Sequence, residues 1–424
     1  MKSSLPKAMH PIAGRPMLAH LIESCSGVFA RVVVVVGPDM PALAQVAQPH
    51  PVVVQHERLG TAHAARQAAG QFGNGDVAVL YGDNPLISAA TLRRLLAARR
   101  APGVGLALLA MRPPDPARYG RVIVADGSVA RIVEFADASE AECEVGLCNA
   151  GVLCGPASDM AAWLAAVRPD NTKGEYYLTD LVALARAAGR RVGAVEAPYD
   201  ELRGINSRAE LADAEAVVQA RLRAAAMEAG VTMTAPQTVF LSADTMLAAD
   251  VTIGPNVVFA PGVTVAEGAE IRAFSHLEGC AVGPRAVIGP FARLRPGTVV
   301  EAGAHVGNFV ELKATRLGAG AKANHLSYLG DADIGAGSNI GAGTITCNYD
   351  GFTKSRTVIG GGVFVGSDAV LVAPVHIGDG AFVAAGSVIT EDVAANAMAF
   401  GRARQVAKPG RAAQFRAARK KGDR

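Results

Sequence analysis

Two parts of the sequence place polar side chains where a ligand could bind. Asp83 follows an apolar run over residues 77–81, which has the length and composition of a buried strand. In sheets whose strands alternate with helices, ligands bind beyond the carboxyl ends of the strands. On its own, Asp83 is better explained as a turn residue before Pro85. The second part is residues 341–354, a polar loop that interrupts a regular repeat, and such loops often carry binding residues.

The cysteines and histidines do not form a recognisable metal-binding motif. None of the six cysteines lies in a Cys-x-x-Cys pair or at zinc-ligand spacing, so we expect free thiols in a reducing cytosol. His305 and His325 raise the alternative of a three-histidine zinc site on a β-helix, as in gamma-type carbonic anhydrases. The other candidates, His276 and His376, are several coils away, which disfavours that alternative.

The composition excludes several classes of protein. Of the 424 residues, 50% are hydrophobic and 19% are charged, which excludes an intrinsically disordered chain. The formal net charge of +3 leaves no nucleic-acid footprint over the whole molecule. The first residues lack the apolar segment of a secretory signal, and the apolar run over residues 32–36 is too short to span a bilayer. We therefore expect a cytoplasmic protein that binds neither nucleic acid nor membrane.

The first half of the chain alternates short β-branched runs with alanine-rich stretches. This pattern predicts strands near residues 32–36, 52–54, 77–81, 105–111, 122–125, 131–135 and 152–154, and helices over residues 60–71 and 88–99. Alternation of this kind favours a mostly parallel sheet with helices on both faces. Residues 207–230 predict one long helix that leads out of this half.

The second half has a repeat of six residues. Apolar side chains recur at this spacing from Leu241 to Leu277, from Val282 to Leu312 and from Ile359 to Ile389. Neither a helix, with period 3.6, nor a simple strand, with period 2, explains it. The repeat predicts a parallel β-helix of hexapeptide turns, with one aliphatic side chain of each short strand inside. Glycine suits the tight corners, and 27 of the 47 glycines follow residue 230.

Short motifs in both halves resemble a single family, in the family's order. In the first half they are Leu5-Pro6-Lys7, Leu59-Gly60-Thr61, Tyr81-Gly82-Asp83, Tyr119-Gly120-Arg121, Gly174-Glu175-Tyr176-Tyr177 and Gly204-Ile205-Asn206. In the second half they lie at residues 293–297, 307–313, 325–331 and 339–351. Together they resemble the bifunctional bacterial enzymes in which a glucosamine-1-phosphate N-acetyltransferase is fused to an N-acetylglucosamine-1-phosphate uridylyltransferase.

The resemblance implies an α/β Rossmann-like nucleotidyltransferase domain followed by a left-handed parallel β-helix of hexapeptide repeats. The expected boundaries are 1–206 for the nucleotidyltransferase domain, 207–230 for a linker helix, 231–402 for the β-helix and 403–424 for a basic tail. Two consecutive steps of UDP-N-acetylglucosamine biosynthesis are implied. The first transfers acetyl from acetyl-CoA to glucosamine-1-phosphate; the second transfers uridylyl from UTP to N-acetylglucosamine-1-phosphate and releases pyrophosphate. The resemblance also implies a homotrimer.

The resemblance assigns roles in uridylyl transfer to residues of the first half. Asp83 and Asn206 would bind Mg²⁺, which bridges the phosphates of UTP and prefers oxygen ligands. The residues that would contact UTP or the N-acetylglucosamine moiety are Lys7, at phosphate oxygens; Gln55, Gly60 and Thr61, at the uracil; and Gly120, Glu134, Asn149 and Thr179, at the sugar.

It likewise assigns roles in acetyl transfer to residues of the second half. His325 would be the base that deprotonates the ammonium group of the substrate, with Glu311 as its orienting carboxylate. The other residues implied are Arg295 and Lys313, for the phosphate; Tyr328, Asn339, Asn348 and Tyr349, for the sugar; Lys354, projecting towards a neighbouring subunit; and Ala342, Ser367, Ala385 and Arg402, lining acetyl-CoA. The basic tail would either reach the 3′-phosphate of coenzyme A or stay solvated.

One departure from the family concerns its N-terminal strand and glycine-rich phosphate-binding loop. In this sequence Met1 stands at the end of that motif. We expect a misassigned or truncated start, because the other pocket residues are present. The alternative is an acetyltransferase whose first domain is retained but inactive. Two further alternatives are a nucleotidyltransferase that uses the β-helix only for oligomerisation, and a non-enzymatic binding solenoid.

Overall fold

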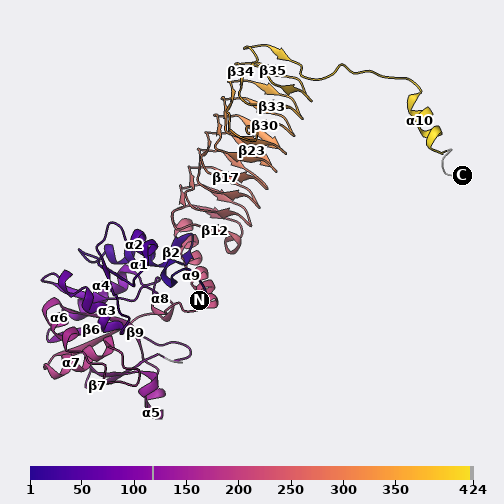
Figure 1. The fold of residues 1–424 in the computed structure, drawn as a ribbon. Coiled ribbons are helices and arrows are strands. Elements are labelled where there is room, and N and C mark those ends of the chain that lie inside the picture. The colour runs from indigo at the N-terminus through magenta and orange to yellow at the C-terminus, as the bar shows by residue number, and fades with distance from the viewer. Residues whose placement is uncertain (117–118, 421–424) are drawn as a thin grey trace. The chain divides into compact units, whose positions relative to one another are not determined.

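The computed structural model describes residues 1–116 and 119–420, and these form two compact units. The first unit is Met1–Leu222 and the second is Arg223–Arg424. Helix α9 (Arg208–Glu228), predicted from the sequence as a long helix, contains the division between them (Figure 1). Residues 421–424 of the expected basic tail lie outside the described residues.

The first unit contains ten strands and nine α-helices among its described residues. The strands are β1 (Pro11–Ile12), β2 (Arg15–Pro16), β3 (Val34–Val36), β4 (Val52–Val54), β5 (Asp76–Val79), β6 (Val104–Met111), β7 (Arg121–Ala125), β8 (Ser128–Val133), β9 (Cys148–Pro156) and β10 (Arg191–Glu196). The helices before α9 are α1 (Met17–Ser26), α2 (Pro41–Val46), α3 (Thr61–Gln67), α4 (Ala89–Arg99), α5 (Glu140–Cys143), α6 (Ala157–Ala166), α7 (Leu181–Ala187) and α8 (Tyr199–Leu202).

The main sheet of this unit is mixed, so the expectation of a mostly parallel sheet is wrong. Its order is β10-β6-β9-β7-β8, with β5 also paired to β9. Only β10 and β6 are parallel, whereas β9 is antiparallel to β5, β6 and β7. Strands β3 and β4 form a separate parallel pair. Alternation of strands and helices in the sequence indicates element type, but strand direction depends on how each connection returns to the sheet.

Strand β6 lies between two hydrophobic clusters of this unit. Leu106 and Leu108 face one cluster, which includes residues of α6 and α7. Ala107 and Leu109 face the other, which includes residues of α1 and α4. Successive side chains of a strand point to opposite faces, so an all-apolar strand is buried on both. The sheet is therefore covered by helices on both faces, as the sequence predicted.

The second unit is a left-handed parallel β-helix. Its short strands, from β11 (Thr232–Met233) to β37 (Met398–Ala399), form three parallel sheets of ten, nine and eight strands (Figure 1). Each sheet receives one strand per coil; in one of them Ile253, Ile271, Ile288 and Val306 lie in register. All four are fully buried. The six-residue repeat predicted this interior correctly.

Some corners of the coils carry bulky residues in place of glycine. Phe274, Phe291 and Phe309 have positive φ values of 61°, 56° and 55°. They are exposed, and their rings stack with centroids 4.8 and 5.2 Å apart. A positive φ is unfavourable for such residues by about 1–2 kcal/mol. Ring stacking between coils offsets part of that cost.

The last described element is helix α10 (Arg411–Lys420), whose described side chains are exposed. Arg419 lies over the ring of Phe415, 4.4 Å from its centroid. Across the described parts of the chain, no helix combines the length and the apolar character that crossing a bilayer requires.

Candidate active sites in the two halves

Three expected residues of the first unit converge on one point. Lys7 lies in a short 3₁₀ helix (Lys7–Met9), Asp83 follows β5, and Asn206 precedes α9. The backbone brings the last two together, because Ile205 N donates to Asp83 O at 3.0 Å. Lys7 Nζ forms an ion pair with Asp83 Oδ2 and donates to Asn206 Oδ1 at 2.5 Å.

This arrangement fits a hard divalent cation. The carboxylate oxygen of Asp83 and the amide oxygen of Asn206 both point at one positive charge, here the ammonium of Lys7. Mg²⁺ prefers oxygen ligands and keeps several waters, so two protein oxygens suffice. Lys7 reaches the same point, and it is also able to contact phosphate oxygens bound beside the ion.

Gln55, Gly60 and Thr61 form a second group, built on the segment around Tyr176. Tyr176 N donates to Leu59 O at 2.8 Å, and Gln55 Nε2 donates to Gly60 O at 3.2 Å. Thr61 Oγ1 accepts from the main-chain N–H of residue 178 at 3.0 Å. Gly60 has a φ of +121°, and a Cβ there would lie 2.6 Å from Tyr176 O. Only glycine fits at this position.

The four residues expected at the sugar also lie together. Asn149 N donates to Gly120 O at 2.8 Å, and Thr179 Oγ1 donates to Glu134 Oε1 at 3.3 Å. A Cβ on Gly120 would lie 3.4 Å from Glu134 Oε2, so the two pairs are neighbours. Burial raises the pKa of Glu134, and the hydrogen bond from Thr179 partly opposes this rise.

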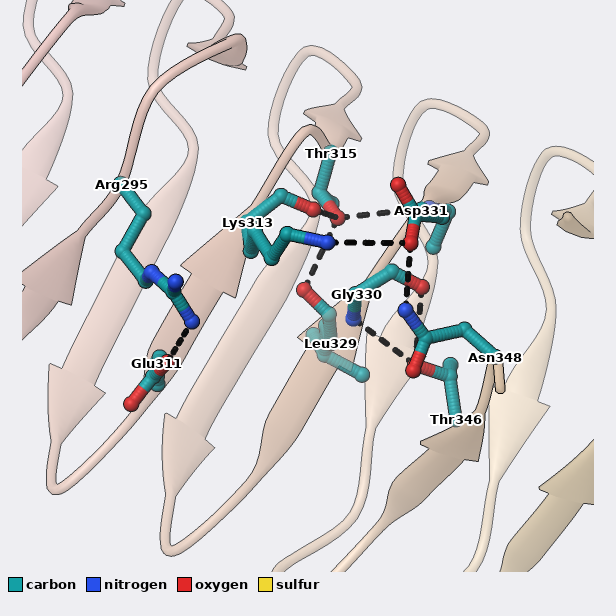
Figure 2. A network of polar contacts seen from close by, with 10 residues as sticks. Arg295, Glu311, Lys313, Thr315, Leu329, Gly330, Asp331, Thr346 and Asn348 are labelled. Carbon is teal, nitrogen blue, oxygen red and sulfur yellow. Dashed lines mark hydrogen bonds and ion pairs between the residues drawn. The ribbon is translucent and has the colours of Figure 1, made fainter. Parts of the chain in front are cut away.

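In the second unit, stacked coils bring the expected acetyl-transfer residues together. Strands β21 (Arg293–Leu294), β24 (Glu311–Lys313), β27 (Tyr328–Gly330) and β30 (Ile345–Cys347) are successive members of one sheet. Arg295 Nη1 donates to Glu311 Oε1 at 2.9 Å (Figure 2). Lys313 pairs in register with Gly330. Both expected phosphate-binding cations therefore lie on this face.

Asp331 joins two of the expected residues and was not singled out from the sequence. Lys313 Nζ lies 3.3 Å from Asp331 Oδ2, and Asn348 Nδ2 donates to the same oxygen (Figure 2). Tyr328 belongs to the same group, since a Cβ on Gly330 would lie 2.5 Å from its hydroxyl and 2.9 Å from Asn348 Nδ2. The signal that could have found Asp331 is its place at the end of the motif over residues 325–331.

His325 has a different partner from the one expected. Its Nδ1 lies 2.8 Å from Asn308 Oδ1, and the two residues are in register on β23 (His305–Asn308) and β26 (Lys322–His325). Glu311, the expected orienting carboxylate, lies on another sheet and pairs with Arg295 and Arg293. An acceptor at Nδ1 places the ring proton there and leaves Nε2 free as a base.

The remaining expected residues are more dispersed. Asn339 is in register with Lys322, on the sheet of His325. Tyr349 and Lys354 form a β-bridge within the loop, and the side chain of Lys354 contacts Lys313. Tyr349 donates its hydroxyl hydrogen to Gly351 O at 2.6 Å, so it is bonded within the loop.

The residues expected to line acetyl-CoA follow one corner of successive coils. Asp368 N donates to Ala342 O at 2.7 Å, and Gly386 N donates to Ser367 O at 2.8 Å. Ala342, Ser367 and Ala385 thus belong to neighbouring coils. Arg402 is exposed, and its Cδ would lie 3.9 Å from a Cβ on Gly386. Arg402 thus places a positive charge at the end of this corner.

Comparison with known proteins supports two functional halves. The family model described as "MobA-like NTP transferase domain" matches residues 1–142, and "Bacterial transferase hexapeptide (six repeats)" matches residues 356–391. The chain is 68% identical over 422 residues to "Bifunctional protein GlmU" of Gluconacetobacter diazotrophicus, covering 99% of this chain and 92% of that protein. Proteins of the same name from Acidiphilium cryptum and Granulibacter bethesdensis are each 65% identical; these matches cover 98% of this chain, and 95% and 93% of those proteins.

Proposed function

The chain belongs to the family of bifunctional GlmU proteins, and from this premise we propose how its two units divide the work. The β-helix transfers acetyl from acetyl-CoA to glucosamine-1-phosphate. The first unit then transfers uridylyl from UTP to N-acetylglucosamine-1-phosphate and releases pyrophosphate. The observation that carries this division is that family motifs meet within each unit, at Lys7, Asp83 and Asn206 in the first and at Lys313 and Asp331 in the second.

For uridylyl transfer, Asp83 and Asn206 are the residues that would hold Mg²⁺ through their oxygens. When bound, the ion would supply positive charge against the charge that develops on the phosphates of UTP during an in-line displacement. Lys7 supplies a further positive charge to the phosphate oxygens. Gln55, Gly60 and Thr61 receive the uracil, and the group around Glu134 receives the sugar of N-acetylglucosamine-1-phosphate.

For acetyl transfer, His325 takes a proton from the ammonium group of glucosamine-1-phosphate through Nε2. Asn308 holds the ring in the required tautomer by accepting from Nδ1. The free amine then attacks the thioester carbonyl, and as the tetrahedral intermediate collapses the nitrogen loses its second proton to water and the C–S bond breaks. Coenzyme A leaves as the thiolate and takes up the proton held by His325. Arg295 and Lys313 bind the phosphate, which suits a planar guanidinium beside a point charge.

The other groups bind the sugar and the coenzyme. Tyr328, Asn339, Asn348 and Tyr349 hold the sugar. A main-chain amide at Ala342 or Ser367 stabilises the negative oxygen of the tetrahedral intermediate. Ala342, Ser367, Ala385 and Arg402 line the acetyl-CoA site along one corner of the coils.

The protein works as a cytoplasmic homotrimer. The hexapeptide repeat supports this assembly, and so does the exposed column of Phe274, Phe291 and Phe309, since contiguous exposed apolar side chains mark contact surfaces. Lys354 extends from its loop towards a neighbouring subunit. All six cysteines are free, as in proteins of a reducing compartment.

Two assays on the same preparation test the proposal. One follows thiol release from acetyl-CoA with glucosamine-1-phosphate, and the other follows pyrophosphate release from UTP with N-acetylglucosamine-1-phosphate and Mg²⁺. His325→Ala should abolish thiol release and leave pyrophosphate release intact, while Asp83→Ala should do the reverse. Thiol release alone in the unmodified chain would support the acetyltransferase-only alternative. Absence of both activities would refute the proposed function.

A further inference from the structure

Asp331 lies between two groups that bind different parts of the same substrate. One oxygen, Oδ2, is 3.3 Å from Lys313 Nζ and also accepts from Asn348 Nδ2 (Figure 2). In the proposed function Lys313 binds the phosphate of glucosamine-1-phosphate and Asn348 binds the sugar. A single carboxylate oxygen therefore links the phosphate-binding and sugar-binding side chains.

The backbone fixes Asp331 from both neighbouring coils. Its N–H donates to Lys313 O at 2.9 Å, and its carbonyl accepts from Thr357 N at 3.2 Å. The preceding residue is held as well, because Gly330 N donates to Thr346 Oγ1 at 2.8 Å. Asp331 has a φ of +47°, which is unfavourable for a residue with a Cβ but better tolerated by aspartate than by most. The fold thus presents this carboxylate in one place.

The charges around Asp331 favour the same interpretation. Lys313 contacts both Asp331 and Lys354, so two ammonium groups meet near one carboxylate. The side chains of Lys313 and Asp331 are only 20% and 22% exposed, which limits screening by water. Without an acceptor oxygen at this position, Lys313 would lose the contact that fixes its ammonium group beside Asn348.

We propose that Asp331 is a positioning residue for acetyl transfer. Its carboxylate holds Lys313 and Asn348 at a fixed separation, so that glucosamine-1-phosphate binds with its amine directed at the base. Asp331 acts through these two side chains and does not itself take part in the chemistry. This inference rests on the proposed acetyltransferase function and adds to it a determinant of substrate orientation.

Two conservative variants distinguish whether the position of the Asp331 oxygen or the charge of Asp331 is what matters. Asp331→Asn removes the charge but keeps an oxygen that can accept from both partners. Asp331→Glu keeps the charge but moves the oxygen by one methylene. If position matters, Asp331→Glu should be the more damaging change. If only charge balance matters, Asp331→Asn should be.

The test measures KM for glucosamine-1-phosphate and for acetyl-CoA, together with kcat, in the full chain. We expect Asp331→Ala to raise KM for glucosamine-1-phosphate about tenfold or more, the effect of losing one charge-assisted hydrogen bond. Asp331→Glu should raise it nearly as much, and Asp331→Asn by less than about threefold. KM for acetyl-CoA and the rate of pyrophosphate release should stay at the unmodified values.

Asp333→Ala is the matched control. Asp333 lies two residues further along the chain and pairs with Arg316 and Arg356 at the surface, away from the substrate-binding side chains. Asp333→Ala also removes a surface ion pair, and it should leave KM for glucosamine-1-phosphate unchanged. If the role of Asp331 were only structural, Asp331→Ala would lower the stability of the protein, as Asp333→Ala would. It would not selectively raise KM for glucosamine-1-phosphate.

The outcomes separate this inference from the function on which it rests. If the unmodified chain releases no thiol, the proposed function fails. If it does, and Asp331→Ala keeps its KM for glucosamine-1-phosphate, or Asp331→Asn proves worse than Asp331→Glu, the positioning role is refuted. Should Asp331→Ala fail to fold, the comparison of the asparagine and glutamate variants decides.

Discussion

At the scale of single residues, each candidate site contains a side chain that is oriented by a hydrogen bond to a second side chain. Asn308 holds the ring of His325 through a contact of 2.8 Å, and Thr179 donates to the carboxylate of Glu134. Such partners set the tautomer of the His325 ring and the charge state of the Glu134 carboxyl group.

Replacing Asn308 should impair catalysis more than binding. Asn308→Ala removes the acceptor at Nδ1 of His325, so the ring populates the tautomer whose Nε2 carries the proton and cannot act as a base. We expect kcat of thiol release to fall about tenfold, less than the 10²–10⁴-fold contribution of a whole general base. Steady-state kinetics measure kcat and KM, and ¹⁵N spectra of labelled histidine report the tautomer. An unchanged kcat with an unchanged spectrum would contradict the prediction.

Glu134 makes the stability of the first unit depend on pH. Burial raises its pKa in the folded state, so the fold disfavours the charged form. The resulting loss of stability is fully present above the folded pKa and disappears as the pH falls below the unfolded value. Glu134→Gln should therefore raise the melting temperature at pH 7.5 but not at pH 4. Thermal unfolding at both pH values checks this, with Glu140→Gln, at an exposed carboxyl of the same unit, as the control.

At the scale of elements, close contact between coils positions two of the residues proposed for acetyl transfer, His325 and its partner Asn308. Gly307 precedes Asn308 in β23, and a Cβ there would lie 1.9 Å from the carbonyl oxygen of Asn324. The neighbouring coil is thus packed directly against the backbone at this point. The spacing between coils here sets the contact between Asn308 and His325.

Gly307→Ala should separate these coils. Because the nearest atoms are backbone, they cannot move aside cheaply, and we expect a loss of more than about 2 kcal/mol in the free energy of unfolding of the β-helix. Gly303→Ala is the control, since a Cβ there meets open space and only its φ of +65° opposes alanine, at about 1 kcal/mol. Urea unfolding followed by circular dichroism measures both. Equal losses in the two variants would show that the contact at Gly307 relaxes.

At the scale of the whole molecule, the proposed function assigns the two activities to separate sets of residues. The oxygens of Asp83 and Asn206, proposed to bind the metal, lie in the first unit, and His325 with its partner Asn308 lies in the second. In the proposed mechanism, acetyl transfer depends on a histidine base, whereas uridylyl transfer depends on a divalent cation.

Removal of divalent cations should therefore separate the activities. With EDTA in excess we expect pyrophosphate release to stop and thiol release to continue at more than about half its rate, since its base needs no metal. Adding back Mg²⁺ should restore pyrophosphate release. Loss of both activities in EDTA would mean that the second site also needs a cation, contrary to the proposed mechanism.

Periodicity and local composition predicted part of the elements; α1, α6, α7 and β10 were not among the expected ranges. The six-residue repeat identified the buried positions of the β-helix, such as Ile253 and Ile271, because each short strand has one inward side chain. The helix expected over residues 207–230 is α9 (Arg208–Glu228), and the strand expected over residues 105–111 is β6 (Val104–Met111). These features depend on neighbours in the chain, which a single sequence displays.

Strand direction and side-chain partners were decided by the tertiary structure. The direction of β9 and the pairing of Glu311 with Arg295 depend on elements brought together from distant segments, and local spacing does not report them. The contact between Asn308 and His325 was within reach, because residues one coil apart stack in register. The sequence by itself thus determined the repeat, the family and the residues expected to do the chemistry. Only the packing of coils and strands determined which side chain orients which, because hydrogen bonds act over about 3 Å and that proximity arises only in the folded chain.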